Sequence, residues 1–323
     1  MTATTAIVFV NTGSPDAPTE AAVRVYLKEF LSDPRVIELP RWFWLPILNG
    51  IVLPIRSSKS AARYAGIWTE DGSPLIVHCR NVVQAVRERL SDLEDVRVEL
   101  AMRVGNPSID SVVSMLVEEG VKRIIFLPMF AQYATQTTES ILDAVKATMA
   151  RFGDKAPIWT SIPAYFDEAL FIDGLAKHYQ RKRGESRYHL VMSFHGIPAK
   201  CSERGDPYES QCQATARALA QAMGLAEGEW SMAYQSRFGS DRWLQPYLPG
   251  HVERLAKKGI TAIDVVCLSF ATDCLETLEE IADELQTTFK VAGGRDFRYL
   301  PCLNDATEAI DLYEHLIRPQ LPK

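Results

Sequence analysis

The sequence predicts an α/β protein built on parallel sheets, and three observations support this fold class. Short apolar runs alternate with amphipathic stretches along the 323 residues, which is the pattern of strands that alternate with helices. Several of these runs are too apolar to leave one face in water, as is typical of parallel strands covered by helices on both sides. A weak internal similarity also relates the two halves of the chain.

The predicted elements follow one another in a regular order. The first strand is "AIVFVN" at 6–11, and the stretch 18–33 follows it with apolar residues at helical spacing. Further strands, with a helical pattern between most neighbours, are predicted at 96–104, 122–130, 157–163, 188–196, 230–236, 262–270 and 296–301.

The internal similarity relates residues 116–141 to residues 255–281. Four identities recur at an offset of 140 residues, namely Phe130 and Phe270, Ala131 and Ala271, Thr137 and Thr277, and Ile141 and Ile281. We therefore predict two similar lobes, 1–165 and 166–323, and expect the last helix to pack back on the first lobe.

Composition excludes several classes of protein. With 47% hydrophobic and 24% charged residues, the chain reads as an ordinary globular protein. A net charge of -6 argues against nucleic acid as the main partner, because phosphate binding needs a basic surface. The six cysteines form no CxxC pair, so neither a zinc site nor a disulfide framework is indicated, and a reducing cytoplasm fits best.

Membrane insertion is not expected either. The N-terminus has no positively charged segment before its short apolar run, so it reads as a first strand and not as a signal peptide. The longest apolar tract, 42–55, is interrupted by two prolines, an asparagine and a glycine. It is too short for a spanning helix.

His195 ends the predicted strand in "VMSFHGIPAK" (191–200) and is followed at once by Gly196. A side chain just past the end of a parallel strand faces the usual ligand crevice, where a neutral imidazole can accept a proton or bind a metal. The alternative is a hydrogen-bonded core or loop histidine.

The stretch "TDCLETLEEIADEL" (272–285) contains six acids and no Lys or Arg. On a continuous helix Glu276, Glu280 and Glu284 would share one face. Such a row of carboxylates suits a path for cations or protons. The alternative is a solvated face whose acids are favoured by the helix N-terminus.

Other stretches indicate a flat apolar ligand that carries carboxylates. The apolar tract runs into Arg56 and Lys59, and Arg103 lies at a strand end. "TGSPD" at 12–16 lacks the further glycines and the lysine of a phosphate loop, so nucleotide binding is not favoured. The ordinary alternative is that the aromatic residues are core.

Four ordered motifs together resemble the ferrochelatases, enzymes that insert ferrous iron into a porphyrin. They are "SFHGIP" (193–198), "GDPY" (205–208), "QSRFG" (235–239) and "DCLETLEE" (273–280). The resemblance covers essentially the whole chain. It implies two Rossmann-like lobes, a chelatase-like fold, with a porphyrin cleft between them.

The resemblance also implies roles for single residues. His195 and Glu276 would be the catalytic pair and the metal-binding residues, and Glu280 and Glu284 would extend a metal or proton path. The porphyrin pocket would include Thr12, Arg56, Arg103, Tyr208, Gln235, Ser236 and Trp243.

The expected reaction is insertion of ferrous iron into protoporphyrin IX, the last step of haem biosynthesis. Thr12 stands where the branch that uses coproporphyrin has a tyrosine, so protoporphyrin is the better expectation. Iron would be a substrate, and an iron–sulfur cluster is expected to be absent because no cysteine-rich extension follows the last predicted helix. We expect a cytoplasmic monomer that touches the inner-membrane surface through the lip at 42–56.

Several alternatives remain at this point. The chain could act on coproporphyrin III, load another metal into another tetrapyrrole, or carry a tetrapyrrole without catalysis. A hydrolase that uses Ser193 with His195 is weaker, because no G-x-S-x-G elbow is present.

Overall fold

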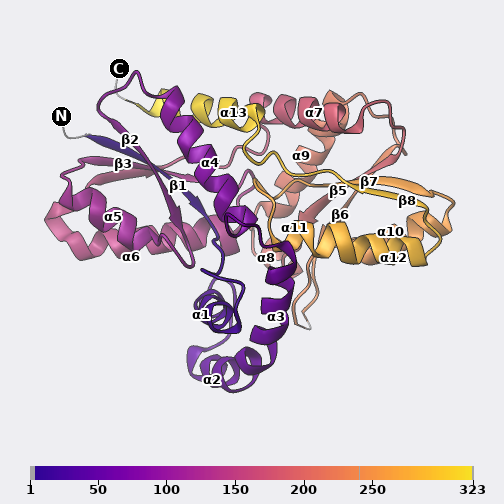
Figure 1. Cartoon of the computed structure of the whole chain (residues 1–323), viewed down its shortest axis with the longest axis horizontal. Coiled ribbons are helices and arrows are strands. Elements are labelled where there is room, and N and C mark those ends of the chain that lie inside the picture. Colours follow the sequence, from indigo (N-terminus) through magenta and orange to yellow (C-terminus); the bar gives the residue numbers. More distant parts are fainter. Residues whose placement is uncertain (1–3, 240, 322–323) are drawn as a thin grey trace. The chain divides into compact units, whose positions relative to one another are not determined.

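The computed structural model describes residues 4–239 and 241–321 and contains two four-stranded parallel sheets in that part of the chain (Figure 1). The described residues form two compact units. The first contains 4–129, 134–163 and 313–321, and the second contains 130–133 and 164–312.

The first sheet has the strand order β2-β1-β3-β4. Its strands are β1 (Thr5–Asn11), β2 (Val96–Met102), β3 (Arg123–Pro128) and β4 (Ile158–Ser161). The helices α5 (Ile109–Glu118) and α6 (Ser140–Phe152) lie on one face of this sheet, and α4 (Pro74–Arg89) lies on the other (Figure 1). Every residue of β1 is buried, as expected for a central strand between two helical layers.

The second sheet repeats this order as β6-β5-β7-β8. Its strands are β5 (His189–His195), β6 (Trp230–Gln235), β7 (Ala262–Cys267) and β8 (Asp296–Tyr299). One face carries α7 (Ala169–Arg183) and α9 (Tyr208–Ala222), and the other carries α10 (Leu248–Lys257) and α12 (Gln286–Val291). The short α8 (Ala199–Glu203) follows β5, and α13 (Thr307–Ile317) begins in the second unit and ends in the first.

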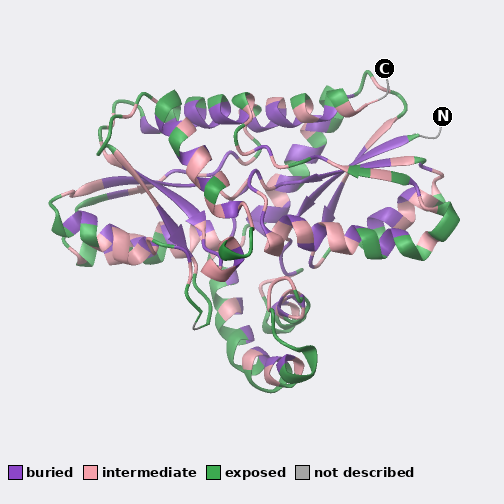
Figure 2. Ribbon diagram, turned by 180° about the vertical axis from the view of Figure 1, so that it is seen from behind, coloured by how far each residue is buried: buried purple, intermediate pink, exposed green. Residues whose placement is uncertain are grey.

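The α/β prediction is confirmed, and each predicted strand is present. Figure 2 shows that the central strands β1, β3, β5 and β7 are buried, whereas the helices expose their outer faces. The edge strands β4 and β8 are partly exposed. The helix α1 (Glu20–Leu31) buries Val23, Tyr26 and Leu31, and the Thr19 hydroxyl caps it by accepting a hydrogen bond from Ala22 N at 3.3 Å.

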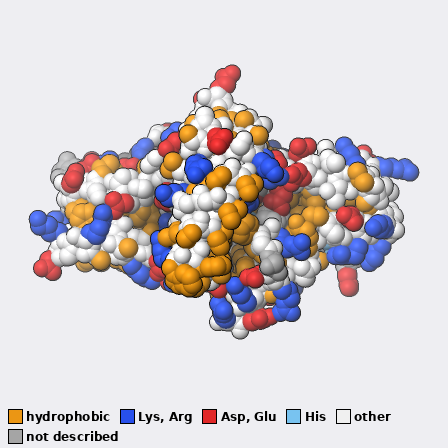
Figure 3. Space-filling model, turned by 90° about the horizontal axis from the view of Figure 1, so that it is seen from below, with side chains coloured by type: hydrophobic (Ala, Val, Ile, Leu, Met, Phe, Trp, Pro, Cys, Tyr) orange, Lys and Arg blue, Asp and Glu red, His pale blue; other side chains and the backbone are white. Residues whose placement is uncertain are grey.

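A helical segment projects from the first unit between α1 and α4. It consists of α2 (Arg41–Ile47), the π-helical turn η1 (Leu48–Val52) and α3 (Leu53–Ile67). Its inner side buries Trp44, Leu48 and Leu53 against the end of α1. Its outer side exposes Trp42, Phe43, Ile51 and Ile55, and Figure 3 shows hydrophobic side chains gathered over this region.

The acidic stretch is not the continuous α-helix that its spacing predicts. The chain forms a short α11 (Leu275–Leu278), then a π-helical turn η4 (Glu280–Leu285), and only then α12. A π turn takes more residues than an α turn. The prediction that Glu276, Glu280 and Glu284 share one helical face at i, i+4 spacing is therefore wrong for this segment.

No helix in the described ranges combines the length and apolarity that crossing a bilayer requires.

Candidate active site

His195 is the last residue of β5, and the structure fixes it from several sides. Its ring Nδ1 lies 2.6 Å from the carbonyl oxygen of Gly196. A carbonyl oxygen can only accept, so Nδ1 carries the proton in the neutral imidazole and Nε2 has a free lone pair. The ring also meets Phe270 edge-on, with centroids 6.1 Å apart.

The backbone of His195 is held by two hydroxyl groups. Its N–H donates to Ser269 Oγ at 2.8 Å, and its carbonyl accepts from Tyr208 Oη at 2.9 Å. Tyr208 is only 4% exposed, and burial raises the pKa of its phenol well above the ordinary value. Tyr208 therefore holds the His195 backbone in place and does not offer its hydroxyl to solvent.

Gly196 leaves no room for a side chain. A Cβ at this position would lie 2.9 Å from the Gln235 carbonyl oxygen, 3.1 Å from that of Ser236 and 3.2 Å from Trp243 Cε3. Trp243 itself is half-buried, and its indole N–H donates to the Phe238 carbonyl at 3.0 Å. The loop after β5 therefore packs directly against the loop after β6.

Gln235 is fully buried and joins two strands to the acidic segment. Its Oε1 accepts from Ser193 Oγ at 2.7 Å, and its Nε2 donates to the Glu276 carbonyl at 2.8 Å. Gln235 thus holds the segment that carries Glu276. Ser193 is also fully buried and bound in this way, so a hydrolase that uses its hydroxyl is disfavoured.

Ser236 binds the Glu280 carboxylate through two hydrogen bonds. Ser236 N donates to Glu280 Oε1 at 2.7 Å, and Ser236 Oγ donates to Oε2 at 2.5 Å. A left-handed backbone, with φ of 55°, brings both Ser236 donors to the same carboxylate. Glu280 is therefore a fixed acid of the site.

Glu280 lies within electrostatic reach of both His195 and Glu276. Burial raises the pKa of Glu280, while the Ser236 hydrogen bonds and the charge of His195 lower it and the charge of Glu276 raises it. Glu276 is half-buried and has no ion pair with Lys or Arg in the described parts of the chain, and Glu284 is exposed. The electrostatic cluster thus consists of one imidazole and two carboxylates.

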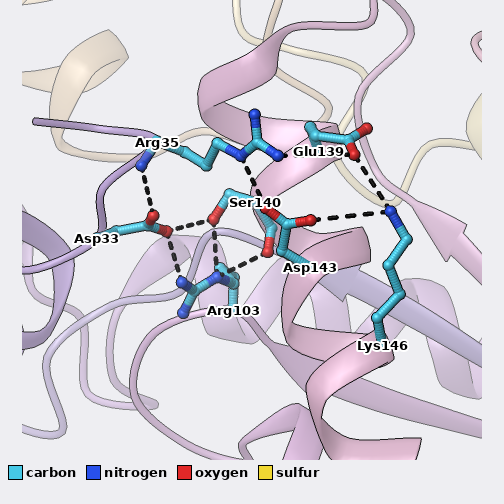
Figure 4. Close-up of polar contacts among 7 residues, drawn as sticks. All are labelled: Asp33, Arg35, Arg103, Glu139, Ser140, Asp143 and Lys146. Carbon is cyan, nitrogen blue, oxygen red and sulfur yellow. Dashed lines mark hydrogen bonds and ion pairs between the residues drawn. The ribbon is translucent and has the colours of Figure 1, made fainter. Parts of the chain in front are cut away.

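Arg103 follows β2 in the first unit and is occupied by a polar network (Figure 4). Its Nη2 donates to Asp33 Oδ2 at 2.5 Å, and its Nε donates to Ser140 Oγ at 2.7 Å. Asp33 is buried and also accepts from the Ser140 hydroxyl and from Arg35 N. The guanidinium charge of Arg103 is thus already balanced within the first unit.

The two other pocket residues predicted in the first unit lie in different places. Thr12 directly follows β1, and its carbonyl accepts from Val104 N at 2.9 Å, next to Arg103. Arg56 is exposed on α3. Thr12, Arg56 and Arg103 belong to the first unit, whereas the other predicted site residues belong to the second.

No sequence pattern indicated a role for Ser269 or Asp33. Ser269 is 74 residues from His195, and Asp33 is 70 residues from Arg103. The first contact follows from the pairing of β5 with β7, which strand patterns do not specify. Only a prediction of strand order could have found it.

The site offers bases and acids but no ready-made metal cage. No group of three or more His, Cys, Asp or Glu side chains suited to a metal ion occurs in 4–239 and 241–321. An imidazole with a free Nε2 beside two carboxylates can take up protons and can contact a divalent cation transiently.

Comparison with solved structures identifies the class of fold. A structure of SirB from Bacillus subtilis with Fe3+ matches with a TM-score of 0.58 at 13% identity, covering 97% of this chain and 94% of that one. The sirohydrochlorin chelatase SirB from Bacillus subtilis subspecies spizizenii, in complex with cobalt, matches with a TM-score of 0.52 at the same identity and coverage. The fold is that of the chelatases.

Sequence comparison gives the family. The ferrochelatase family model matches residues 4–321. The chain is 46% identical to the ferrochelatase of Azoarcus sp. (strain BH72), covering 99% of this chain and 88% of the relative. It is 42% identical to that of Vibrio parahaemolyticus, covering 98% of both. The chain belongs to the ferrochelatase family of enzymes.

Proposed function

We propose that the protein inserts ferrous iron into protoporphyrin IX to make protohaem, the last step of haem biosynthesis. Full-length family membership supports the reaction class. The observation that carries the mechanism is His195, whose Nδ1 is held at the Gly196 carbonyl so that Nε2 is free to accept a proton.

The reaction requires a base as well as a metal path. A free-base porphyrin carries two inner N–H protons, and ferrous iron replaces both, so two protons leave for each haem formed. His195 Nε2 accepts a proton from one pyrrole nitrogen as the metal binds the opposite lone pairs, and the proton of the other pyrrole nitrogen leaves to the Glu276 carboxylate. Binding the macrocycle in a bent shape exposes those lone pairs and spends binding energy on the transition state.

Glu276 is the proposed partner of His195 in proton or metal transfer. Its half-buried carboxylate lacks a basic ion-pair partner in the described residues, so its negative charge is available to a cation. Two side chains hold ferrous iron weakly enough to release it, which suits a substrate metal. Glu280 and Glu284 continue this path toward the exposed end of η4.

The remaining pocket residues are proposed in two roles. Ser236 and Trp243 in the second unit, and Thr12, Arg56 and Arg103 in the first, are proposed to contact the porphyrin. Tyr208 and Gln235 are buried, and their contacts support a role in holding His195 and Glu276 in place.

The exposed apolar side of α2, η1 and α3 supports contact with a membrane surface that supplies the hydrophobic porphyrin. We place the reaction in the cytoplasm, at the inner-membrane surface, in a monomer. The proposal includes no iron–sulfur cluster, in keeping with the expectation from the sequence.

The decisive experiment is anaerobic incubation of the protein with protoporphyrin IX and ferrous iron. Loss of porphyrin fluorescence and appearance of the haem absorption bands measure insertion, and coproporphyrin III is run in parallel. The variants His195→Ala and Glu276→Gln should each lower kcat by at least about 100-fold. Glu253→Gln, which removes a partly exposed acid on α10, is the matched control and should keep normal turnover.

Each outcome decides a different part of the proposal. Turnover with coproporphyrin III in preference to protoporphyrin IX would change the substrate. Binding without turnover would make the protein a tetrapyrrole carrier. Normal rates in folded His195→Ala and Glu276→Gln variants would overturn the assigned roles.

A further inference from the structure

Ser269 stands out among the residues around His195 because it has no part in the proposed chemistry and yet contacts the base directly. It lies two residues beyond the end of β7, where the chain leaves the sheet toward the acidic segment. Its hydroxyl oxygen accepts a hydrogen bond from the backbone N–H of His195 at 2.8 Å.

This hydrogen bond takes the place of a missing strand contact. The pairing of β5 with β7 ends at Ser193 and Cys267, followed by one further bond from Leu268 N to the Ser193 carbonyl at 2.9 Å. A backbone N–H at a strand end needs another acceptor, since leaving a buried donor unpaired is costly. The Ser269 side chain supplies that acceptor, so hydrogen bonding between β5 and the chain that leaves β7 continues as far as His195.

A second hydroxyl holds the other side of His195. Tyr208 Oη donates to the His195 carbonyl at 2.9 Å. The two hydroxyl groups therefore bracket the peptide groups on both sides of the His195 Cα. Phe270, the next residue after Ser269, rests edge-on against the imidazole.

We propose that Ser269 is a positioning residue for His195. It fixes the backbone from which the imidazole projects, so that Nδ1 stays on the Gly196 carbonyl and Nε2 keeps its aim at the substrate. The proposal rests on the proposed function for its kinetic consequence, and on the geometry of β5 and β7 alone for its effect on the His195 ring.

The experiment compares Ser269→Ala, which removes the acceptor, with Ser269→Thr, which keeps a hydroxyl at the same position. Ser202→Ala is the matched control, because the Ser202 hydroxyl is buried in α8 of the same unit and has no hydrogen-bond partner among the residues that the structure describes. The readouts are the kcat and KM for protoporphyrin, the pH profile of kcat/KM, and the side-chain 15N resonances of His195.

Ser269→Ala should lower kcat about tenfold or more with KM changed less than about twofold, because a small displacement of a base costs transition-state binding. The pH profile should shift, and the His195 15N shifts should report a mixture of tautomers. Ser269→Thr should restore most of kcat, and Ser202→Ala should match the wild type.

Unchanged His195 resonances in Ser269→Ala would overturn the proposal, as would a loss of activity that Ser269→Thr does not restore. The NMR readout needs no turnover. If the wild-type protein inserted no iron, the proposed function would fail, and the effect of Ser269 on the His195 ring would still be measured.

Discussion

At the scale of single residues, the site depends on how closely its loops approach one another. His195 acts from the end of β5, and the chain turns immediately through Gly196 against the carbonyl groups of Gln235 and Ser236. The Gly196 carbonyl also fixes the tautomer of His195. The close packing of the loops and the position of the proton on the His195 ring therefore both depend on Gly196.

Gly196→Ala should damage both stability and activity. The added Cβ would lie 2.9 Å from the Gln235 carbonyl oxygen, so the loops must move apart. Such overpacking costs about 1–3 kcal/mol, and displacement of His195 should lower kcat roughly tenfold or more. Thermal unfolding and the iron-insertion assay measure the two effects.

Gly250→Ala is the control for this change. Gly250 lies in α10, and its nearest neighbour to an added Cβ is the flexible Arg254 guanidinium at 3.5 Å. Alanine is favoured over glycine in a helix by roughly 0.5–1 kcal/mol, so this variant should be at least as stable as the wild type. Equal behaviour of the two variants would contradict the packing argument.

Glu280 should show its burial in the pH dependence of stability. Burial raises the pKa of its carboxyl in the folded protein. The folded state therefore binds more protons than the unfolded state between the unfolded pKa and the raised one, and stability falls as pH rises through that window. Glu280→Gln has no carboxyl group to ionise, so it does not lose stability in this way as pH rises. The Tm of the variant, relative to the wild type, should rise between pH 4.5 and pH 8, and a difference that shrinks with pH would refute the assignment.

At the scale of elements, two π-helical turns alter what helical periodicity predicts. In the acidic segment η4 follows α11 and breaks the even spacing of the glutamates. In the apolar segment η1 joins α2 to α3. Trp44 still packs inward, where its indole N–H donates to the Leu31 carbonyl at 2.7 Å, while its neighbours Trp42 and Phe43 point outward.

The outward aromatic residues should carry the proposed membrane contact. Replacing both Trp42 and Phe43 by serine removes apolar area that would otherwise leave water, so binding to vesicles of phosphatidylethanolamine and phosphatidylglycerol should weaken at least about tenfold. Co-sedimentation measures the affinity. Val291→Ser removes a side chain that is 85% exposed on α12 and should leave binding unchanged. Equal binding by all three proteins would remove the membrane role.

The sequence predicted elements better than contacts between them. Strands such as 188–196 and 262–270 were found from local apolar runs, which report burial directly. The shape of the acidic segment was predicted wrongly, because a π turn leaves no local signal. The roles of Gln235 and Tyr208 as buried supports, and the occupation of Arg103 by Asp33, depend on partners brought in by the fold.

At the scale of the whole molecule, stability should depend on two histidines away from the site, His189 at the start of β5 and His251 in α10. His189 and His251 both place Nε2 2.8 Å from Ser231 Oγ. The second nitrogen of His189 lies 3.0 Å from the Gly228 carbonyl, so it carries a proton. His251 Nε2 therefore donates to Ser231, and Ser231 donates to His189 in the neutral network.

This network should make the protein less stable in mild acid. Burial, together with the charges of Arg254, His189 and Lys258, lowers the pKa of His251 to about 4. The histidine pKa in the unfolded state is about 6.5. Between the two pKa values the unfolded state therefore binds more protons than the folded state. The contribution is present above that value and is lost as pH falls toward about 4.

We expect the free energy of unfolding to drop by about 1–2 kcal/mol from this residue between pH 7 and pH 5. His251→Gln keeps a donor for Ser231 but does not titrate, so its drop should be smaller. Urea unfolding at the two pH values, followed by tryptophan fluorescence, measures both. An identical drop in the variant would exclude His251 as the source.

The repeated strand order places β2 and β6 at corresponding positions of the two sheets, and similar contacts follow both strands. Arg103 is the first residue after β2 and binds Ser140, and Ser236 is the first residue after β6 and binds Glu280. Ser140 and Glu280 stand 140 residues apart, the offset of the internal similarity. A contact of the same kind therefore recurs at corresponding points of the two units. Glu280 attaches the acidic segment to the end of β6 and at the same time contributes a carboxylate to the site, so a substitution at this position changes the anchoring of the segment as well as its charge.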